Sequence, residues 1–166
     1  LEWRGRRRLA ERRKAPLFSA FPTSVSLYQN SNSRKLTVLK EHEIYIRVRY
    51  VEADPMGYLH HSNYFTYFEM GRTELFRSSG GNYREIEESG LFFVVTKLEC
   101  RFLAPARYDD ELTLSTKIIR STMAKLEHEY ELRRGDTILT TAKSVLACVD
   151  STGRVQRMPD SIVDID

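Results

Sequence analysis

Apolar side chains recur at two different periods along this chain, and the order of these periods restricts its fold. Residues 43–50 alternate apolar and polar side chains, and a period of two predicts a half-buried strand. From residue 62 onward, apolar side chains lie three and four positions apart, which predicts an amphipathic helix. Ser62 or Asn63 is a suitable N-cap for this helix, and the pair Gly80-Gly81 would end it.

Four strand-like runs follow this helix, and no second long helix interrupts them. A short helical turn over residues 83–89 comes first, and tight turns are predicted at residues 134–136 and 151–153. One strand, one long helix and a meander of long strands predict an α+β fold, with an antiparallel sheet packed on a single helix. The predicted strands of the meander cover residues 91–103, 111–121, 125–133 and 137–149.

A carboxylate stands at the turn between the first strand and the helix. Asp54 is followed by Pro55, and Gly57 allows both a tight turn and a close approach of a ligand to the backbone. A polar His-Ser-Asn cluster then begins the helix, so the carboxylate can lie beside the unpaired N–H groups of the helix start. This arrangement suits attack on a carbonyl carbon, because the carboxylate acts as base or nucleophile and the helix end stabilises the oxyanion.

The same segment resembles a known family. Its pattern of Asp-x-x-Gly-x-x-x-His, followed by a tyrosine and by Glu-x-x-Arg, is similar to that of the 4-hydroxybenzoyl-CoA thioesterase-like acyl-CoA thioesterases. Residues 102–112 resemble the central strand–turn–strand segment of that family, and residues 147–159 resemble its last hairpin. The three blocks occur in the order that the family shows, so the resemblance extends from about residue 42 to about residue 160.

The resemblance implies a hotdog fold, which is an antiparallel β-sheet wrapped around one long α-helix. It implies hydrolysis of an acyl-CoA thioester to a carboxylic acid and free CoA, with Asp54 and His61 as catalytic residues. Gly57 and Tyr64 would contact the substrate. No metal or cofactor is implied, because the thioester carbonyl is already activated and a thiolate is a good leaving group. A homodimer or homotetramer with active sites between subunits is also implied.

Several of these residues have a structural interpretation as well. His61 could serve the helix start as a cap, and Tyr64 could be a core aromatic residue on the buried helix face. His60 matches no family role and is interpreted as structural. Glu69 corresponds in kind to the helical glutamate that a related branch of hotdog thioesterases uses in catalysis. Its spacing from Arg72 instead favours an intrahelical ion pair.

Charge divides the chain near residue 40. Residues 1–40 carry ten lysines and arginines against two glutamates, whereas the rest of the chain has a net charge of −5. The basic segment is predicted to be a flexible tail, and residues 41–166 are predicted to form the hotdog thioesterase domain. A mildly acidic domain argues against nucleic-acid binding by the body of the protein.

The remaining sequence features concern location and alternative functions. No membrane span is predicted, because no run of about 18 apolar residues occurs. Cys100 and Cys148 lie in strand-like runs and are predicted to be reduced, which favours the cytoplasm. Two other functions stay open: a hydratase or dehydratase on the same fold, and a non-enzymatic acyl-thioester-binding regulator whose basic tail would bind DNA.

Overall fold

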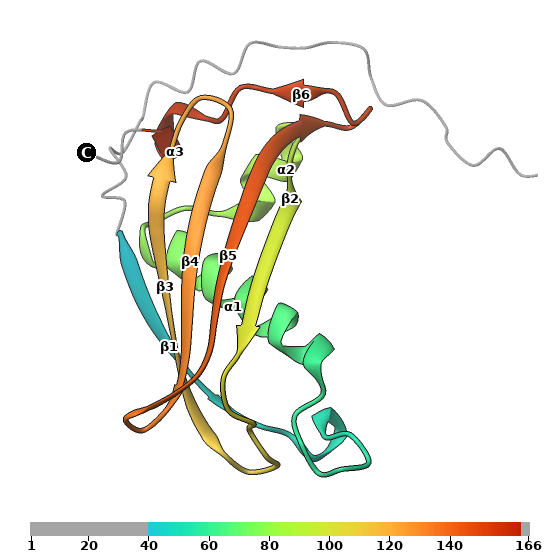
Figure 1. The fold of residues 1–166 in the computed structure, drawn as a ribbon. Coiled ribbons are helices and arrows are strands. Elements are labelled where there is room, and N and C mark those ends of the chain that lie inside the picture. Colours follow the sequence, from blue (N-terminus) through green and yellow to red (C-terminus); the bar gives the residue numbers. More distant parts are fainter. Residues whose placement is uncertain (1–39, 164–166) are drawn as a thin grey trace, which may run out of the picture. The chain divides into compact units, whose positions relative to one another are not determined.

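A computed structural model of the protein describes residues 40–163, without the side chains of residues 161 and 163. The predicted tail therefore lies almost wholly outside the described residues, and the division at residue 40 stays a prediction. Within the described range, six antiparallel strands form one sheet, and one long helix lies across a face of it (Figure 1). The α+β architecture predicted from the order of the apolar periods is confirmed.

The order of helices and strands along the chain also follows the prediction. Strand β1 (Glu41–Arg47) comes first, then the short helix η1 (Tyr50–Glu52) and the long helix α1 (His61–Ser78). The other elements are α2 (Tyr83–Glu88), β2 (Leu91–Phe102), β3 (Glu111–Ser121), β4 (Leu126–Arg134), β5 (Thr137–Asp150), β6 (Val155–Gln156) and α3 (Asp160–Val163). The sheet order is β1-β3-β4-β5-β2, with β6 paired to β5, so β1 and β2 lie at the two edges of the main sheet.

The end of the first strand differs from the prediction. The alternation of apolar residues was expected to continue to Tyr50, but β1 ends at Arg47 and the Tyr50 side chain is 79% exposed. The chain turns away from the sheet at this point because residues 50–52 form η1, which Arg49 and Glu52 close in a capping box. The prediction failed because the side-chain pairing that ends the strand is local and polar, and the apolar period does not report it.

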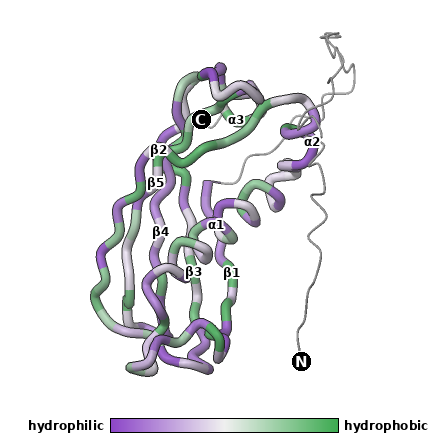
Figure 2. The backbone as a smooth tube through the Cα atoms, turned by 90° about the vertical axis from the view of Figure 1, so that its right-hand side faces the viewer, coloured by the Kyte–Doolittle hydropathy of each residue, from purple (hydrophilic) through white to green (hydrophobic). Residues whose placement is uncertain are grey.

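The core lies between α1 and the sheet, in two clusters. Figure 2 shows hydrophobic and hydrophilic residues alternating along the strands, and every second residue of β4 is buried as far as Leu132. One cluster includes Phe68 of α1, whose ring centre lies 4.8 Å from that of Tyr130 in β4. The second cluster includes Leu146 and Met158, together with Phe76 from the last turns of α1. Both halves of α1 are therefore packed, and its first turn is held in a defined place.

Both cysteines are free thiols. Cys148 is buried and Cys100 is half-buried, and burial raises the pKa of each thiol. Among the described residues, no helix has the length and the apolar character that a membrane crossing requires.

Candidate functional site

The Asp54 carboxylate is fixed by the backbone of its own turn. Its Oδ1 atom accepts hydrogen bonds from the N–H groups of Met56 at 2.9 Å and of Tyr58 at 3.1 Å. The N–H of Gly57 donates to the Asp54 carbonyl oxygen at 2.9 Å, and Gly57 has a φ of +77°, where glycine is favoured. Among residues 40–163, Asp54 Oδ2 accepts no hydrogen bond. One oxygen thus orients the side chain, while the other is available to a ligand.

A second segment of chain supports this turn. Tyr58 and Arg107 form an antiparallel bridge, and the N–H of Leu59 donates to the carbonyl oxygen of Ala106 at 2.8 Å. The Arg107 guanidinium carbon lies 4.4 Å from the centre of the Tyr58 ring, a cation–π contact. The Arg107 N–H donates to the carboxylate of Asp110 at 2.8 Å. The connection between β2 and β3 therefore fixes the turn from outside.

The start of α1 is tied to the segment that carries Asp54. Ala53 pairs with Leu59 in an antiparallel bridge, which folds the chain back on itself around the turn. The N–H of His60 then donates to the carbonyl oxygen of Glu52 at 2.9 Å. The residues on both sides of the turn are thus joined, and the helix start is adjacent to the segment that carries Asp54.

The N-cap of α1 is His60, so the prediction of Ser62 or Asn63 as the cap is wrong. The Nδ1 atom of His60 accepts a hydrogen bond from the Ser62 N–H at 3.3 Å, and it lies 2.8 Å from Ser62 Oγ. The cap role that was considered for His61 is filled by His60. His60 therefore has the structural role that the sequence analysis assigned to it. The His61 side chain is exposed, with its ring centre 4.2 Å from that of His60. Among the described residues, the His61 backbone N–H has no acceptor and remains available as a donor.

A buried carboxylate that the sequence patterns do not single out lies two residues before Asp54. Glu52 is 4% exposed, and it accepts hydrogen bonds from Arg49 and from the hydroxyl of Tyr67. Burial by itself raises the pKa of Glu52, but the hydrogen bonds from Arg49 and Tyr67 outweigh burial, and the pKa is lowered. The Arg-x-x-Glu spacing is a sequence sign of the first contact, whereas the contact with Tyr67 follows only from the fold.

Tyr64 and Glu69 have clear places on α1. Tyr64 is 3% exposed and packs edge to face against Phe102, with ring centres 5.0 Å apart; burial raises its pKa. It is a core residue of the described chain, and its contact with an acyl group stays a prediction. Glu69 forms an ion pair with Arg72 at 3.2 Å, and 68% of its side chain is exposed. The predicted intrahelical pair is confirmed.

Comparison with known proteins places this arrangement in a family. The model of the Thioesterase superfamily matches residues 56–141, a segment that includes all of α1 and begins two residues after Asp54. The acyl-CoA thioester hydrolase YbgC of Escherichia coli O157:H7 is 31% identical over 120 residues, which cover 71% of this chain and 90% of that protein.

Other relatives extend the comparison to plants and to solved structures. The chloroplastic acyl-acyl carrier protein thioesterase ATL3 of Arabidopsis thaliana is 30% identical over 124 residues, which cover 73% of this chain and 65% of that protein. The crystal structure of the DHNA-CoA thioesterase from Staphylococcus aureus superposes with a TM-score of 0.69 at 26% identity, over 70% of this chain and 80% of that one. The predicted hotdog fold is confirmed, and the chain belongs to the thioesterase superfamily.

Proposed function

We propose that the chain hydrolyses acyl-CoA thioesters to a carboxylic acid and free CoA, with Asp54 as nucleophile or general base. One observation carries this proposal: the turn orients Asp54 through Oδ1 and leaves Oδ2 available, beside a helix start with an unused N–H donor. The acyl-CoA substrate is supported by the relatives named as acyl-CoA thioester hydrolases. Membership in the thioesterase superfamily favours this function over a hydratase and over a non-enzymatic regulator.

Two routes of hydrolysis are compatible with this arrangement. In the first, Asp54 Oδ2 takes a proton from a water molecule while the water oxygen attacks the thioester carbon. In the second, Oδ2 attacks that carbon directly, CoA leaves as a thiolate, and water then hydrolyses the acyl anhydride. Both routes place negative charge on the carbonyl oxygen, which the backbone N–H of His61 would stabilise. Breaking of the carbon–sulfur bond releases the CoA thiolate, which takes up a proton.

The other predicted site residues have supporting roles in this proposal. Gly57 would let the backbone approach the acyl group closely, since glycine carries no side chain and favours the positive φ of this turn. The exposed His61 ring would contribute to substrate positioning, and its backbone rather than its side chain would hold the oxyanion. Tyr64 would contact the acyl group through the part of the core that borders Phe102.

A homodimer or homotetramer is part of the same proposal. Strand β2 lies at the edge of the sheet and carries Val94, Val95 and Phe102 with exposed fractions of 38%, 45% and 51%. An exposed edge strand with apolar side chains favours pairing with another chain. A second copy pairing there would complete active sites between subunits. Residues 1–40 precede the matched segment, and we propose that hydrolysis does not require them; a cytoplasmic location stays a prediction.

A hydrolysis screen tests the proposal directly. The purified chain is mixed with a series of acyl-CoAs and with one acyl-acyl carrier protein, and free thiol is measured over time. Release of CoA thiol that falls about 10²–10⁴-fold in Asp54→Asn supports the proposal, because the amide keeps the shape of the side chain but is neither base nor nucleophile. Binding of acyl-CoA without thiol release would support the regulator instead. Turnover of the carrier-protein substrate alone would overturn CoA as the substrate carrier.

A further inference from the structure

Glu52 accepts hydrogen bonds both through its side-chain carboxylate and through its backbone carbonyl oxygen. Its Oε1 accepts hydrogen bonds from Arg49 Nε at 3.0 Å and Nη2 at 2.7 Å, and its Oε2 accepts from the Arg49 N–H at 2.8 Å and the Tyr67 hydroxyl at 2.7 Å. Its carbonyl oxygen accepts from the His60 N–H at 2.9 Å and from Asn63 Nδ2 at 3.0 Å. The side chain and the backbone of one residue therefore hold the N-cap of α1 and two positions within the helix.

We propose that Glu52 is a positioning residue that holds the first two turns of α1 at a fixed distance from the Asp54 turn. The inference rests on the proposed function, because it concerns the carboxylate and the helix donor that act together on the thioester. Glu52 and Asp54 are separated by Ala53 alone, which pairs with Leu59 just before the helix. A shift of Glu52 relative to α1 would therefore change the distance between Asp54 Oδ2 and the His61 N–H.

The chemistry of the contacts supports a rigid link. Hydrogen bonds from a guanidinium and a phenol to an ionised carboxylate are stronger than neutral ones. The carboxylate is buried, so water competes little for these bonds, whereas Arg49 reaches it from the surface with 71% of its side chain exposed. Replacement by glutamine would leave an amide N–H₂ facing donors and would weaken the attachment of the helix.

The test compares Glu52→Gln in two backgrounds. In the wild-type background, kcat on an acyl-CoA should fall about tenfold to 10²-fold while KM changes little, because a small misplacement of catalytic groups has this cost. In the Asp54→Asn background, Glu52→Gln should have little further effect on the residual rate, because the positioned carboxylate is already inactive. A purely structural role would lower the rate by the same factor in both backgrounds.

Tyr67→Phe is the matched variant if Glu52→Gln does not fold. It removes one hydrogen bond to Glu52 and keeps the ring in the core, so it should lower kcat by a smaller factor with the same dependence on Asp54. A folded Glu52→Gln or Tyr67→Phe with wild-type kcat overturns the inference and leaves the proposed function intact. A wild-type chain that releases no thiol from any acyl thioester overturns both.

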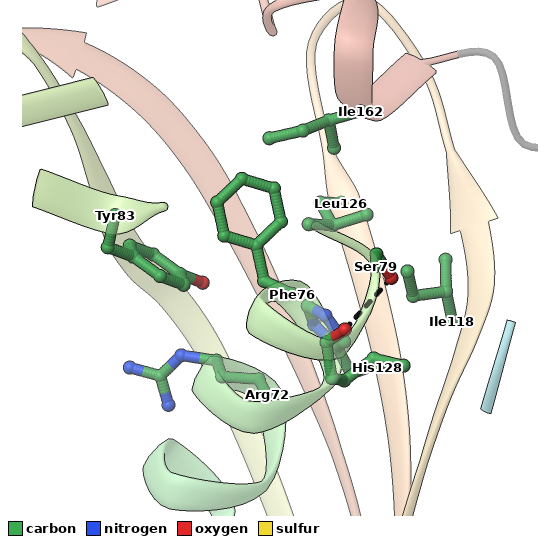
Figure 3. A pocket seen from close by; sticks show the side chains of 9 residues that line it. Arg72, Phe76, Ser79, Tyr83, Ile118, Leu126, His128 and Ile162 are labelled. Carbon is green, nitrogen blue, oxygen red and sulfur yellow. Dashed lines mark hydrogen bonds between the residues drawn. The ribbon is translucent and has the colours of Figure 1, made fainter. Parts of the chain in front are cut away.

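A separate observation concerns the other end of α1. A cavity of about 20 Å³ lies between the last turns of α1, helices α2 and α3, and strands β3 and β4 (Figure 3). Five of its lining residues are apolar, but Arg72, Ser79, Tyr83 and His128 also border it. His128 is 2% exposed, and its Nδ1 atom has no hydrogen-bond partner among the described residues. A buried ring nitrogen without a partner is rare in proteins and costs stability.

We infer that this cavity binds one ordered water molecule that is hydrogen-bonded to His128 Nδ1. A single water needs about 10–15 Å³ of such space and two to four polar partners, and the cavity meets the first condition. For the second condition, the polar side chains of Ser79 and Tyr83 also line the cavity. The water would join β4 to the elements that line the other sides of the cavity.

A crystal structure at high resolution, with and without xenon, tests this site. The expected result is a density peak at hydrogen-bond distance from His128 Nδ1 in the wild-type protein and no xenon there, since a polar site retains its water. His128→Leu should lose the peak. Xenon in the wild-type cavity, or a cavity without density in a well-ordered crystal, overturns the inference. If His128→Leu does not fold, the wild-type crystals alone decide.

Discussion

Gly71 of α1 lies so close to Thr116 of β3 that a methyl group at position 71 would overlap the Thr116 hydroxyl, and it would lie 2.9 Å from Leu114 Cδ2. Thr116 is fully buried, and its hydroxyl has no hydrogen-bond partner among the described residues. The helix therefore approaches the sheet closely at a position where it has no side chain. This contact sets the depth of α1 in the sheet, and with it the place of the helix start beside Asp54.

Gly71→Ala should lower the free energy of unfolding by about 1–3 kcal/mol, measured by urea denaturation. Alanine gains about 1 kcal/mol of helix propensity over glycine, but the overlap with buried atoms of β3 outweighs that gain. Thr116→Ala removes the overlapping hydroxyl, so the double variant should recover much of the loss. Equal stability of Gly71→Ala and wild type, or a double variant no more stable than Gly71→Ala, would contradict this account.

We expect His128 to make the stability of the protein depend on pH. Burial, together with the nearby charge of Arg72, lowers the pKa of His128 from 6.5 to about 3. Between these values the unfolded chain binds a proton that the folded chain does not, so stability falls as the pH falls through this range. The loss is about 1.4 kcal/mol for each pH unit below about 6. Stability is unaffected by this group above its unfolded pKa.

Urea denaturation at several pH values between about 7 and about 5 measures this effect. His128→Gln should show a shallower loss over the same range, because it has no group that takes up the proton. The stability of His128→Gln at neutral pH is compared with that of the wild type separately, because a difference there reports packing and not titration. Parallel pH profiles for the wild type and His128→Gln would show that another group is responsible.

Much of the fold follows from the apolar periods, and the reasons are visible in particular elements. The limits of β3 and α2 are reproduced to within a residue; α2, for example, is followed by Gly90, which favours a turn. The Asp54 turn was predictable because Gly57, with its positive φ, is a position that glycine favours. These features depend on local sequence alone.

The features that sequence analysis missed depend on contacts between distant segments. The choice of His60 as N-cap follows from its backbone bond to Glu52, which fixes where the helix can start, whereas cap preferences alone favour Ser62 or Asn63. The importance of Glu52 depends on Tyr67, fifteen residues later. Gly71 lies inside an apolar helical pattern, and only the packing against β3 shows why a glycine stands there.

The edge of the sheet yields a prediction about assembly. The purified chain should be a dimer or tetramer by light scattering at micromolar concentration, because β2 leaves apolar side chains uncovered. Val95→Lys should weaken this assembly and lower activity with it, since it places a charge at the edge. Val155→Lys in β6, which is 71% exposed, is the matched control and should change neither. A fully active monomer would show that each site is complete within one chain.

Substitutions at the three candidate polar residues should reduce the rate of hydrolysis to different extents. Asp54→Asn should abolish most hydrolysis while substrate binding persists, because Oδ2 is the group that is proposed to react. His61→Ala should reduce kcat less, since the backbone N–H that is proposed to hold the oxyanion survives the change. Glu69→Gln should keep near wild-type turnover, and the loss of its exposed ion pair with Arg72 should cost at most about 1 kcal/mol of stability.

Steady-state kinetics with one acyl-CoA substrate, together with thermal unfolding of each variant, checks this order. The Asp54 and Glu69 variants are matched, because each replaces a carboxylate by an amide of the same shape. The two positions also differ in their surroundings. Asp54 is fixed by the backbone N–H groups of its own turn, whereas the Glu69 carboxylate pairs with Arg72 and is 68% exposed. If Glu69→Gln is folded and inactive while Asp54→Asn retains turnover, the catalytic carboxylate is on the helix and the assignment of Asp54 is wrong.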